Sequence, residues 1–225
     1  MGVRIPVFSQ PASQPALSTP WIKICGITSN ADARAAAALG VDALGAVLYP
    51  PSSRAVEAGQ LAEIYAGVPP GVRRVALLVN AERSLVDAVV SSGVIDLLQF
   101  HGDEDEQFCA SFPVPYMKAI RVADERQAAN DIQAFPGAEM VLLDSYQKNV
   151  PGGTGKTFDW GVAARLVAGS DMRIVLAGGL RPDNVSEALR RVKPFGVDVS
   201  SGVESRPGVK DQALLEEFIE GAVNG

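Results

Sequence analysis

Lys23 and Cys25 stand two positions apart in a short apolar run that breaks at Gly26. If this run is a β-strand, alternation places the ammonium and the thiol on one face, with Ile22 and Ile24 on the other. A nearby cation favours the thiolate, and a thiolate can act as a nucleophile, a metal ligand or a general base. We therefore expect a chemical site at the carboxyl end of this strand.

The counts of cysteine and histidine narrow those three roles. The chain has two cysteines, Cys25 and Cys109, and one histidine, His101, so the sequence offers neither a disulfide framework nor a Cys/His cluster for a metal. No acyl-transfer triad surrounds Cys25 either. Cys109 is expected in a helix core, and an inert core position is the alternative for Cys25, because free cysteine is often buried. Two unpaired cysteines favour a reducing, cytoplasmic setting.

Polar or glycine-rich segments end four further apolar runs. Gln99 and His101 share a face at the end of one run, and Asp144 directly follows another. Glycines at the ends of the last two runs allow backbone N–H groups to approach an anion without an intervening Cβ. We therefore expect a phosphate site made by Gly178, Gly179, Ser200, Ser201 and Gly202.

These runs belong to a regular alternation of strand-like and helix-like patterns. The expected strands are 21–25, 42–48, 73–79, 95–100, 115–120, 138–143, 173–177 and 196–200. The expected helices are 30–40, 56–66, 82–92, 104–112, 124–134, 159–168, 182–191 and 211–223. Eight βα units in about 205 residues predict a compact (β/α)8 TIM barrel, a single α/β domain over 21–225, with its active site at the carboxyl ends of the strands. A doubly wound open sheet is the alternative.

Composition excludes other classes of function. The chain has 20 basic and 26 acidic residues, a net charge of −6, and no basic cluster that would indicate nucleic acid binding. No apolar stretch reaches the roughly 18 residues of a membrane span. Residues 1–20 are rich in Pro, Ser and Gln and lack the apolar core of a secretory signal, so we expect a disordered tail or an over-long start there. The sequence leaves the choice between monomer and homodimer open.

Six segments together resemble the phosphoribosylanthranilate isomerase family. They are 23–28, 98–103, the strand end at Asp144, GGTGKTFDW at 152–160, AGGLRPDNV at 177–185 and GVDVSSGVESRPGVKD at 196–211. They occur in order between residue 21 and about residue 223. The resemblance implies a ribulose-phosphate-binding barrel that performs an Amadori rearrangement in tryptophan biosynthesis, acts on a small anionic substrate and needs no metal or organic cofactor.

The resemblance also implies roles for the two central residues. The reaction opens the ribose ring of N-(5′-phosphoribosyl)anthranilate and yields 1-(o-carboxyphenylamino)-1-deoxyribulose 5-phosphate. By similarity Cys25 is the base at C2′ and Asp144 the acid at the ring oxygen, on strands three steps apart around the barrel. Lys23 or turn N–H groups would help Cys25 to ionise. Asp144 would have to hold a proton near neutral pH, although the pKa of a free Asp is about 3.9.

Further substrate contacts follow from the same resemblance. Arg54 matches the residue that meets the anthranilate carboxylate, which a guanidinium can bind bidentately. Gly153 and Gly155 lie in a loop that resembles a mobile flap over the substrate. The remaining expected substrate contacts are Lys23, Gln99 and His101. Two of these residues have an alternative, supporting role: Lys23 would shape the electrostatic field at the site, and His101 would orient a loop or hydrogen-bond a neighbour. Asp198 is expected as a hydrogen-bond acceptor behind the site.

Three alternative functions agree less well with the sequence. A P-loop is suggested by Gly155, Lys156 and Thr157, but its pattern needs a glycine at position 150, which is Val150. A barrel that only binds a sugar phosphate has no need for Cys25 and Asp144. The dual-substrate isomerase of histidine and tryptophan synthesis carries an aspartate base on its first strand, where this chain has Cys25.

Overall fold

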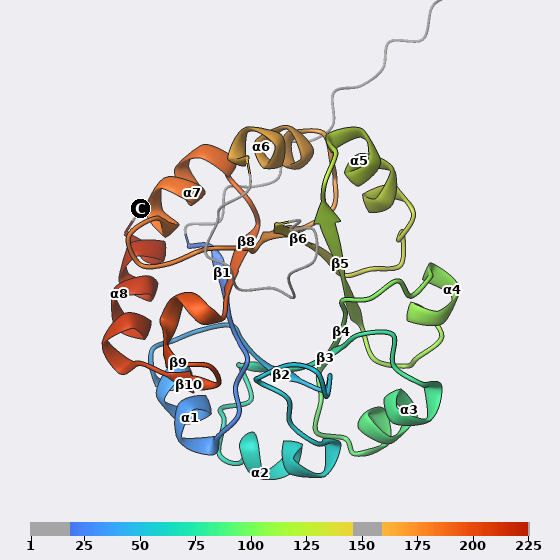
Figure 1. Ribbon diagram of the computed structural model, residues 1–225, viewed down its shortest axis with the longest axis vertical. Coiled ribbons are helices and arrows are strands. Elements are labelled where there is room, and N and C mark those ends of the chain that lie inside the picture. The colour runs from blue at the N-terminus through green and yellow to red at the C-terminus, as the bar shows by residue number, and fades with distance from the viewer. Residues whose placement is uncertain (1–18, 146–158, 225) are drawn as a thin grey trace, which may run out of the picture.

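Eight parallel strands close into a barrel in chain order, and the helices form a ring around it (Figure 1). The computed structural model describes residues 19–145 and 159–224. The closed sheet confirms the predicted (β/α)8 TIM barrel and rules out the open doubly wound alternative. The tail expected at 1–20 falls almost entirely outside the described residues, so that expectation stays a prediction.

Every strand overlaps its predicted range. The strands are β1 (Trp21–Cys25), β2 (Ala43–Val47), β3 (Arg73–Leu78), β4 (Leu97–Phe100), β5 (Tyr116–Val122), β6 (Met140–Ser145), β7 (Ile174–Leu176) and β8 (Gly196–Val199). β1 matches its prediction at both ends, because its alternating pattern stops at Gly26, whose φ of +77° suits glycine. β5 and β6 continue two residues farther than expected, so Asp144 lies within β6 rather than after it.

Two helices are much shorter than predicted. The helices are α1 (Asn30–Ala38), α2 (Leu61–Ile64), α3 (Arg83–Ser91), α4 (Glu106–Cys109), α5 (Glu125–Gln133), α6 (Trp160–Ala168), α7 (Val185–Val192) and α8 (Gln212–Val223). The predicted helix 56–66 contains a 3-10 turn, η1 (Ala58–Gln60), before α2 and ends ahead of Gly67, whose φ is +73°. The predicted helix 104–112 shrinks to α4, because the Asp105 side chain caps it and Pro113 follows closely.

A small hairpin between β8 and α8 was not predicted. After β8 the chain forms a 3-10 turn, η2 (Ser201–Val203), and then two antiparallel strands, β9 (Glu204–Arg206) and β10 (Val209–Lys210). Gly208 makes the reversal with a φ of +78°. The Thr28 hydroxyl donates to the Gly208 carbonyl at 2.5 Å, which ties the hairpin to the loop after β1. The hairpin therefore lies beside the barrel's first strand (Figure 1).

The core has two layers. A large apolar layer lies between the sheet and the helices, and a smaller one fills the inside of the barrel. The interior layer consists of Ala43, Val75, Leu97, Met117, Ala119, Met140, Leu142, Val175 and Ala177. Polar side chains are also buried: Lys23 and Gln99 have no exposed surface, and Asp198 is 8% exposed. Burying charged groups costs free energy, and such groups are common at functional sites. We therefore expect the site in this polar part of the interior.

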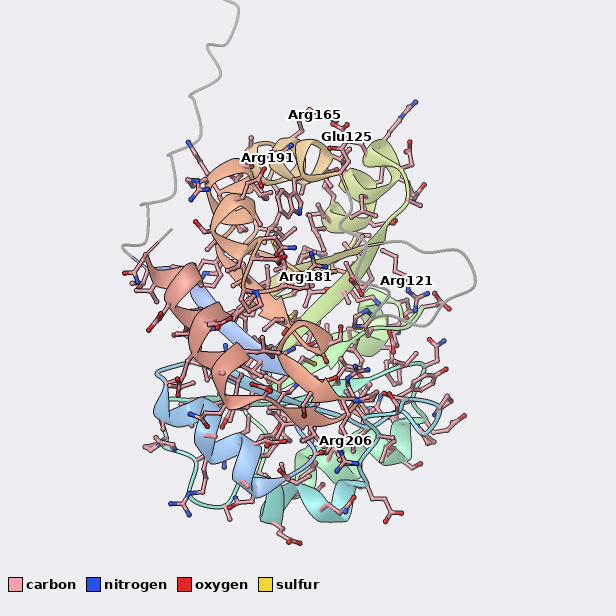
Figure 2. The ribbon with its side chains drawn as sticks, turned by 60° about the vertical axis from the view of Figure 1, so that its left-hand side comes forward. Arg121, Glu125, Arg165, Arg181, Arg191 and Arg206 are labelled. Atoms are coloured by element: carbon pink, nitrogen blue, oxygen red, sulfur yellow. The ribbon has the colours of Figure 1, made fainter. Side chains whose placement is uncertain are left out.

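The outer ring carries exposed ion pairs that contribute little to stability. The Glu125 carboxylate on α5 accepts from the Arg165 guanidinium on α6 at 2.8 Å, at the periphery of the molecule (Figure 2). A cavity of about 640 Å³ lies beside this pair, between α5 and α6. It lies among the helices and contains none of the predicted site residues. Among residues 19–145 and 159–224, no helix is long and apolar enough to cross a membrane.

Candidate active site

The carboxyl half of β1 holds a buried ammonium beside a buried thiol. Lys23 Nζ donates to Asp198 Oδ1 at 2.8 Å, and the two residues are direct partners in the β1–β8 ladder. This confirms Asp198 as a hydrogen-bond acceptor. Because Lys23 has no exposed surface, it fits the role of shaping the field better than direct substrate contact. Cys25 is 5% exposed and packs with Val47 and Leu77 at the top of the barrel interior.

Gly45 makes room for this arrangement, although no pattern in the sequence singles it out. Gly45 is the β2 partner of Cys25. A Cβ at this position would lie 3.0 Å from Cys25 Sγ and 3.2 Å from Lys23 Nζ, closer than nearly all real Cβ contacts. A glycine inside a strand often marks a close approach of other atoms. Here it lets the thiol and the ammonium stand side by side.

Burial and charge act against each other on this pair. Burial raises the pKa of the Cys25 thiol, and the Lys23 ammonium lowers it by less, so the net pKa is raised. Burial lowers the pKa of Lys23, but attraction by Asp198 and Cys25 together outweighs it, so Lys23 keeps its proton. Lys23 therefore acts in the predicted direction, yet it does not by itself produce a thiolate.

Asp144 on β6 belongs to a chain of polar side chains that begins on β4, with β5 between the two strands. Gln99 Nε2 lies 3.2 Å from His101 Nδ1, and His101 Nε2 lies 3.2 Å from Asp144 Oδ2. If the Gln99 amide donates to Nδ1, the imidazole carries its proton on Nε2 and donates it to the carboxylate. This hydrogen bond orients the Asp144 carboxylate, which agrees with the supporting role predicted for His101. Gln99 Oε1 is buried, and it has no hydrogen-bond partner among the described residues.

The two halves of the site meet at one rim. β1 and β6 are separated by β7 and β8 in a sheet whose strands are all parallel, so Cys25 and Asp144 both stand at the carboxyl ends. A parallel barrel brings such strand ends together at one mouth. The fold therefore places a thiol and a carboxylate on different sides of the same opening, as the acid/base hypothesis requires.

The loops after β7 and β8 bring the five phosphate candidates onto neighbouring segments. Gly178 and Gly179 have φ values of +85° and +69°, which L side chains rarely adopt. A Cβ on Gly202 would overlap the Leu180 carbonyl oxygen, so the two loops touch through bare backbone. Ser200 and Ser201 begin the η2 turn in the second loop. Phosphate binding by these residues remains a prediction.

Arg54 lies at the rim but is already paired. Its guanidinium binds the Glu204 carboxylate at 2.6 Å, and the Arg54 side chain is 16% exposed. Sequence reasoning missed Glu204 and Lys210, because an isolated charge in a loop is usually solvated; the Arg-Pro-Gly turn at 206–208 was the available signal for a hairpin. Gly153 and Gly155, predicted in the flap, lie outside the described residues.

Residues 22–221 match the family model for N-(5′-phosphoribosyl)anthranilate isomerase. The chain belongs to this family. The N-(5′-phosphoribosyl)anthranilate isomerase of Cellvibrio japonicus is 48% identical over 198 residues, which cover 88% of this chain and 91% of that protein.

Solved structures of phosphoribosylanthranilate isomerases share the fold. The enzyme from Thermotoga maritima superposes with a TM-score of 0.83 at 36% identity, covering 92% of this chain and all of that one. A phosphoribosylanthranilate isomerase in complex with reduced 1-(o-carboxyphenylamino)-1-deoxyribulose 5-phosphate gives a TM-score of 0.79 at 34% identity, with the same coverage. The family resemblance inferred from the sequence is confirmed.

Proposed function

We propose that this isomerase uses Cys25 as its general base and Asp144 as its general acid in converting N-(5′-phosphoribosyl)anthranilate to 1-(o-carboxyphenylamino)-1-deoxyribulose 5-phosphate. The observation that carries the proposal is the presence of both groups at one barrel rim, on strands separated by two others. A sugar bound in the mouth can then meet a proton donor on one side and an acceptor on the other.

The acid acts first. Protonation of the ribose ring oxygen by Asp144 allows the C1′–O bond to break, and the nitrogen lone pair forms the C1′=N bond of an iminium ion. The broken ring oxygen becomes the C4′ hydroxyl. The hydrogen bond between His101 Nε2 and Asp144 Oδ2 supports this role, because it holds the carboxyl group of Asp144 in one orientation.

The base acts next. The Cys25 thiolate removes the C2′ proton, and the electron pair of the C2′–H bond neutralises the iminium nitrogen to give an enolamine. The enolamine tautomerises to the ketone as C1′ gains a proton and the C2′ hydroxyl loses one, which returns the thiol and the carboxylate to their starting states. Atoms and protons balance without an external oxidant, because the reaction moves hydrogen within one molecule. The ammonium of Lys23 supports the thiolate, since it lowers the pKa of Cys25 against the effect of burial.

The two anionic ends of the substrate suggest the remaining contacts. Backbone N–H groups at Gly178 and Gly179, with those at 200–202, would hold the phosphate, and Arg54 would hold the anthranilate carboxylate. The expected flap at 153–155 would cover the sugar. A cytoplasmic location and a monomeric or homodimeric state complete the proposal, and fractionation and sedimentation velocity test them.

The assay follows the fluorescence decay of N-(5′-phosphoribosyl)anthranilate. We expect Cys25→Ala and Asp144→Asn each to lower kcat by about 10²- to 10⁴-fold, the usual contribution of a positioned acid or base. The matched controls are Cys109→Ala, which removes the other buried thiol, and Asp96→Asn, which alters a carboxylate just before β4 at the opposite end of the barrel.

Both controls should keep wild-type kcat within about three-fold, the range of ordinary distant substitutions. A near-wild-type rate in Cys25→Ala or in Asp144→Asn would remove that residue from the mechanism. Turnover of the aminoimidazole substrate of histidine synthesis would extend the activity to that of the dual-substrate enzymes.

A further inference from the structure

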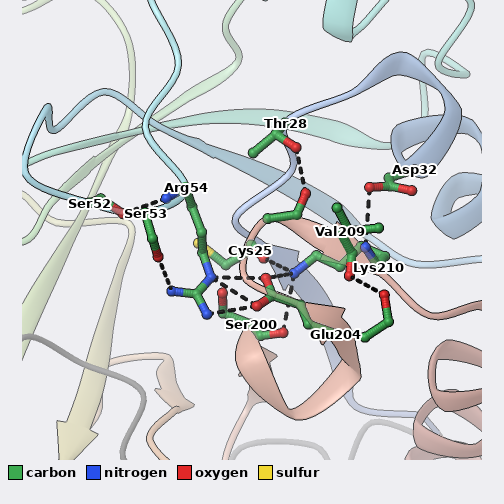
Figure 3. Close-up of polar contacts among 12 residues, drawn as sticks. Cys25, Thr28, Asp32, Ser52, Ser53, Arg54, Ser200, Glu204, Val209 and Lys210 are labelled. Carbon is green, nitrogen blue, oxygen red and sulfur yellow. Dashed lines mark hydrogen bonds and ion pairs between the residues drawn. The ribbon is translucent and has the colours of Figure 1, made fainter.

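Arg54, Glu204 and Lys210 form a cluster of three charges at the end of β1, in which Arg54 is partly exposed and the other two side chains are buried (Figure 3). Arg54 Nε lies 2.9 Å and Nη2 2.6 Å from the Glu204 carboxylate, and Lys210 Nζ lies 2.8 Å from Glu204 Oε1. The side chains of Glu204 and Lys210 are 3% and 1% exposed. Two cations share one carboxylate, so the cluster keeps one net positive charge.

The geometry leaves one end of the guanidinium open to a second carboxylate. Glu204 occupies the edge formed by Nε and Nη2, whereas Nη1 lies 3.5 Å from the Ser53 hydroxyl, at the limit of a hydrogen bond. A guanidinium can bind one carboxylate along that edge and another across Nη1 and Nη2. Glu204 therefore fixes the plane and direction of the Arg54 guanidinium and leaves other N–H groups of the guanidinium able to bind a second carboxylate.

Lys210 ties Glu204 to the strand that carries the thiol. Its ammonium donates to the Cys25 carbonyl at 2.6 Å and to the Ser200 carbonyl at 3.2 Å, in addition to Glu204. Arg54 is also confined from the other side, because a Cβ at Gly26 would lie only 2.6 Å from Arg54 Cδ. Through Glu204 and Lys210, the guanidinium is thus anchored to the backbone at the end of β1 and directly after β8.

A buried ion pair is weak evidence for a stabilising role, because desolvation of the charges offsets their attraction. A three-charge cluster beside the site is better explained by orientation of the guanidinium. We propose that Glu204 is a positioning residue that aims Arg54 at the substrate's aromatic carboxylate, with Lys210 holding Glu204 in place. This inference rests on the proposed function and makes the β9–β10 hairpin a determinant of selectivity for a carboxylated amine.

The test compares two substrates, N-(5′-phosphoribosyl)anthranilate and N-(5′-phosphoribosyl)aniline, which lacks the carboxylate. Glu204→Gln should raise KM for the first by about ten-fold, the loss of one charge-assisted hydrogen bond, and change kcat by less than about three-fold. KM for the aniline substrate should stay unchanged. Glu139→Gln is the control, because Glu139 pairs with Arg73 at 2.5 Å at the opposite end of the barrel.

A double-mutant cycle separates positioning from a general structural role. In the Arg54→Met background, Glu204→Gln should have no further effect on KM, because its action passes through Arg54. Glu204→Asp, which keeps the charge for Lys210 but shortens the reach to Arg54, repeats the comparison if Glu204→Gln folds poorly. An equal rise in KM for both substrates, or a rise that persists without Arg54, would overturn the inference while leaving the proposed function intact. If Arg54→Met itself leaves KM for the carboxylated substrate unchanged, the role proposed for Arg54 fails, and the inference fails with it.

Discussion

The ionisation of Cys25 depends on the charged groups that lie beside its thiol. Burial raises the pKa of Cys25, and Lys23 is the group that most strongly opposes this effect. Asp198 raises the pKa of Cys25 and at the same time keeps Lys23 protonated. The thiol is therefore held neutral but close to a permanent cation, an arrangement in which a modest change of environment can shift it toward the thiolate.

This balance predicts the reactivity of Cys25 toward iodoacetamide. Because only the thiolate reacts, the rate of alkylation of Cys25 should increase with pH and be low near neutral pH. Lys23→Met removes the charge that lowers the pKa of Cys25, so the alkylation rate at a fixed pH of about 8 should fall about ten-fold, the effect of one pKa unit. Peptide mapping by mass spectrometry distinguishes Cys25 from Cys109, whose pKa burial raises to about 12.

Lys118→Met is the matched control for losing a buried lysine. Its ammonium pairs with Glu104 at 3.2 Å on another face of the barrel, so the alkylation rate of Cys25 should not change. Equal alkylation rates in wild type and Lys23→Met would show that Lys23 does not support the thiolate. This readout is independent of turnover and stands even if another residue proves to be the base.

At the scale of elements, the proposed phosphate site depends on two loops that touch through glycine. Gly202 has no room for a Cβ, because that atom would overlap the Leu180 carbonyl in the loop after β7. We expect Gly202→Ala to push the loops after β7 and β8 apart, to raise KM by about ten-fold through a lost phosphate contact, and to lower kcat less. Inhibition by inorganic phosphate should weaken in parallel.

Gly59→Ala provides the control for this substitution. Gly59 lies in η1, and no atom lies within 4 Å of the position its Cβ would take. Its kinetics and phosphate inhibition should match wild type. Wild-type phosphate inhibition in a folded Gly202→Ala variant would contradict the assignment of these loops to the phosphate.

How far the sequence predicts these elements depends on how local their signals are. β1 was predicted at both ends, because alternation and the break at Gly26 lie within six residues. Asp144 and His101 were found by their places after apolar runs, but their hydrogen bond joins residues 43 positions apart and has no local signal. The β9–β10 hairpin was missed because its strands are three and two residues long and only partly apolar. Gly45 was missed because its importance comes from the neighbouring strand.

At the scale of the whole molecule, the Lys23–Asp198 pair lies on the seam where the first and last strands close the barrel. We expect Asp198→Asn to lower the free energy of unfolding at pH 7 by about 3–5 kcal/mol, because it leaves a buried ammonium without its counter-charge. Urea denaturation followed by circular dichroism measures this difference. The double variant Lys23→Met/Asp198→Asn should recover most of the loss, since it removes the isolated charge.

The same pair predicts the pH dependence of stability. The pKa of folded Lys23 is raised above its ordinary 10.5, so the folded state binds the proton more tightly than the unfolded state. Its stabilising contribution is then fully present below pH 10.5 and is lost as the pH rises through the folded pKa. The stability difference between wild type and Asp198→Asn should therefore narrow above pH 10.5; a constant difference would contradict the shift.

The closing seam also has a consequence for synthesis. Lys23 and Asp198 are 175 positions apart, and Lys210, which holds the Cys25 carbonyl, follows Cys25 by 185. At about 5–20 residues per second, a ribosome needs on the order of 10–30 s to reach Asp198 after making Lys23. During that interval β1 has no β8 to pair with, and its thiol lacks the cover that the closed barrel gives it. During synthesis Cys25, the proposed base, is therefore open to oxidation, and the barrel covers it only once the last strand is complete.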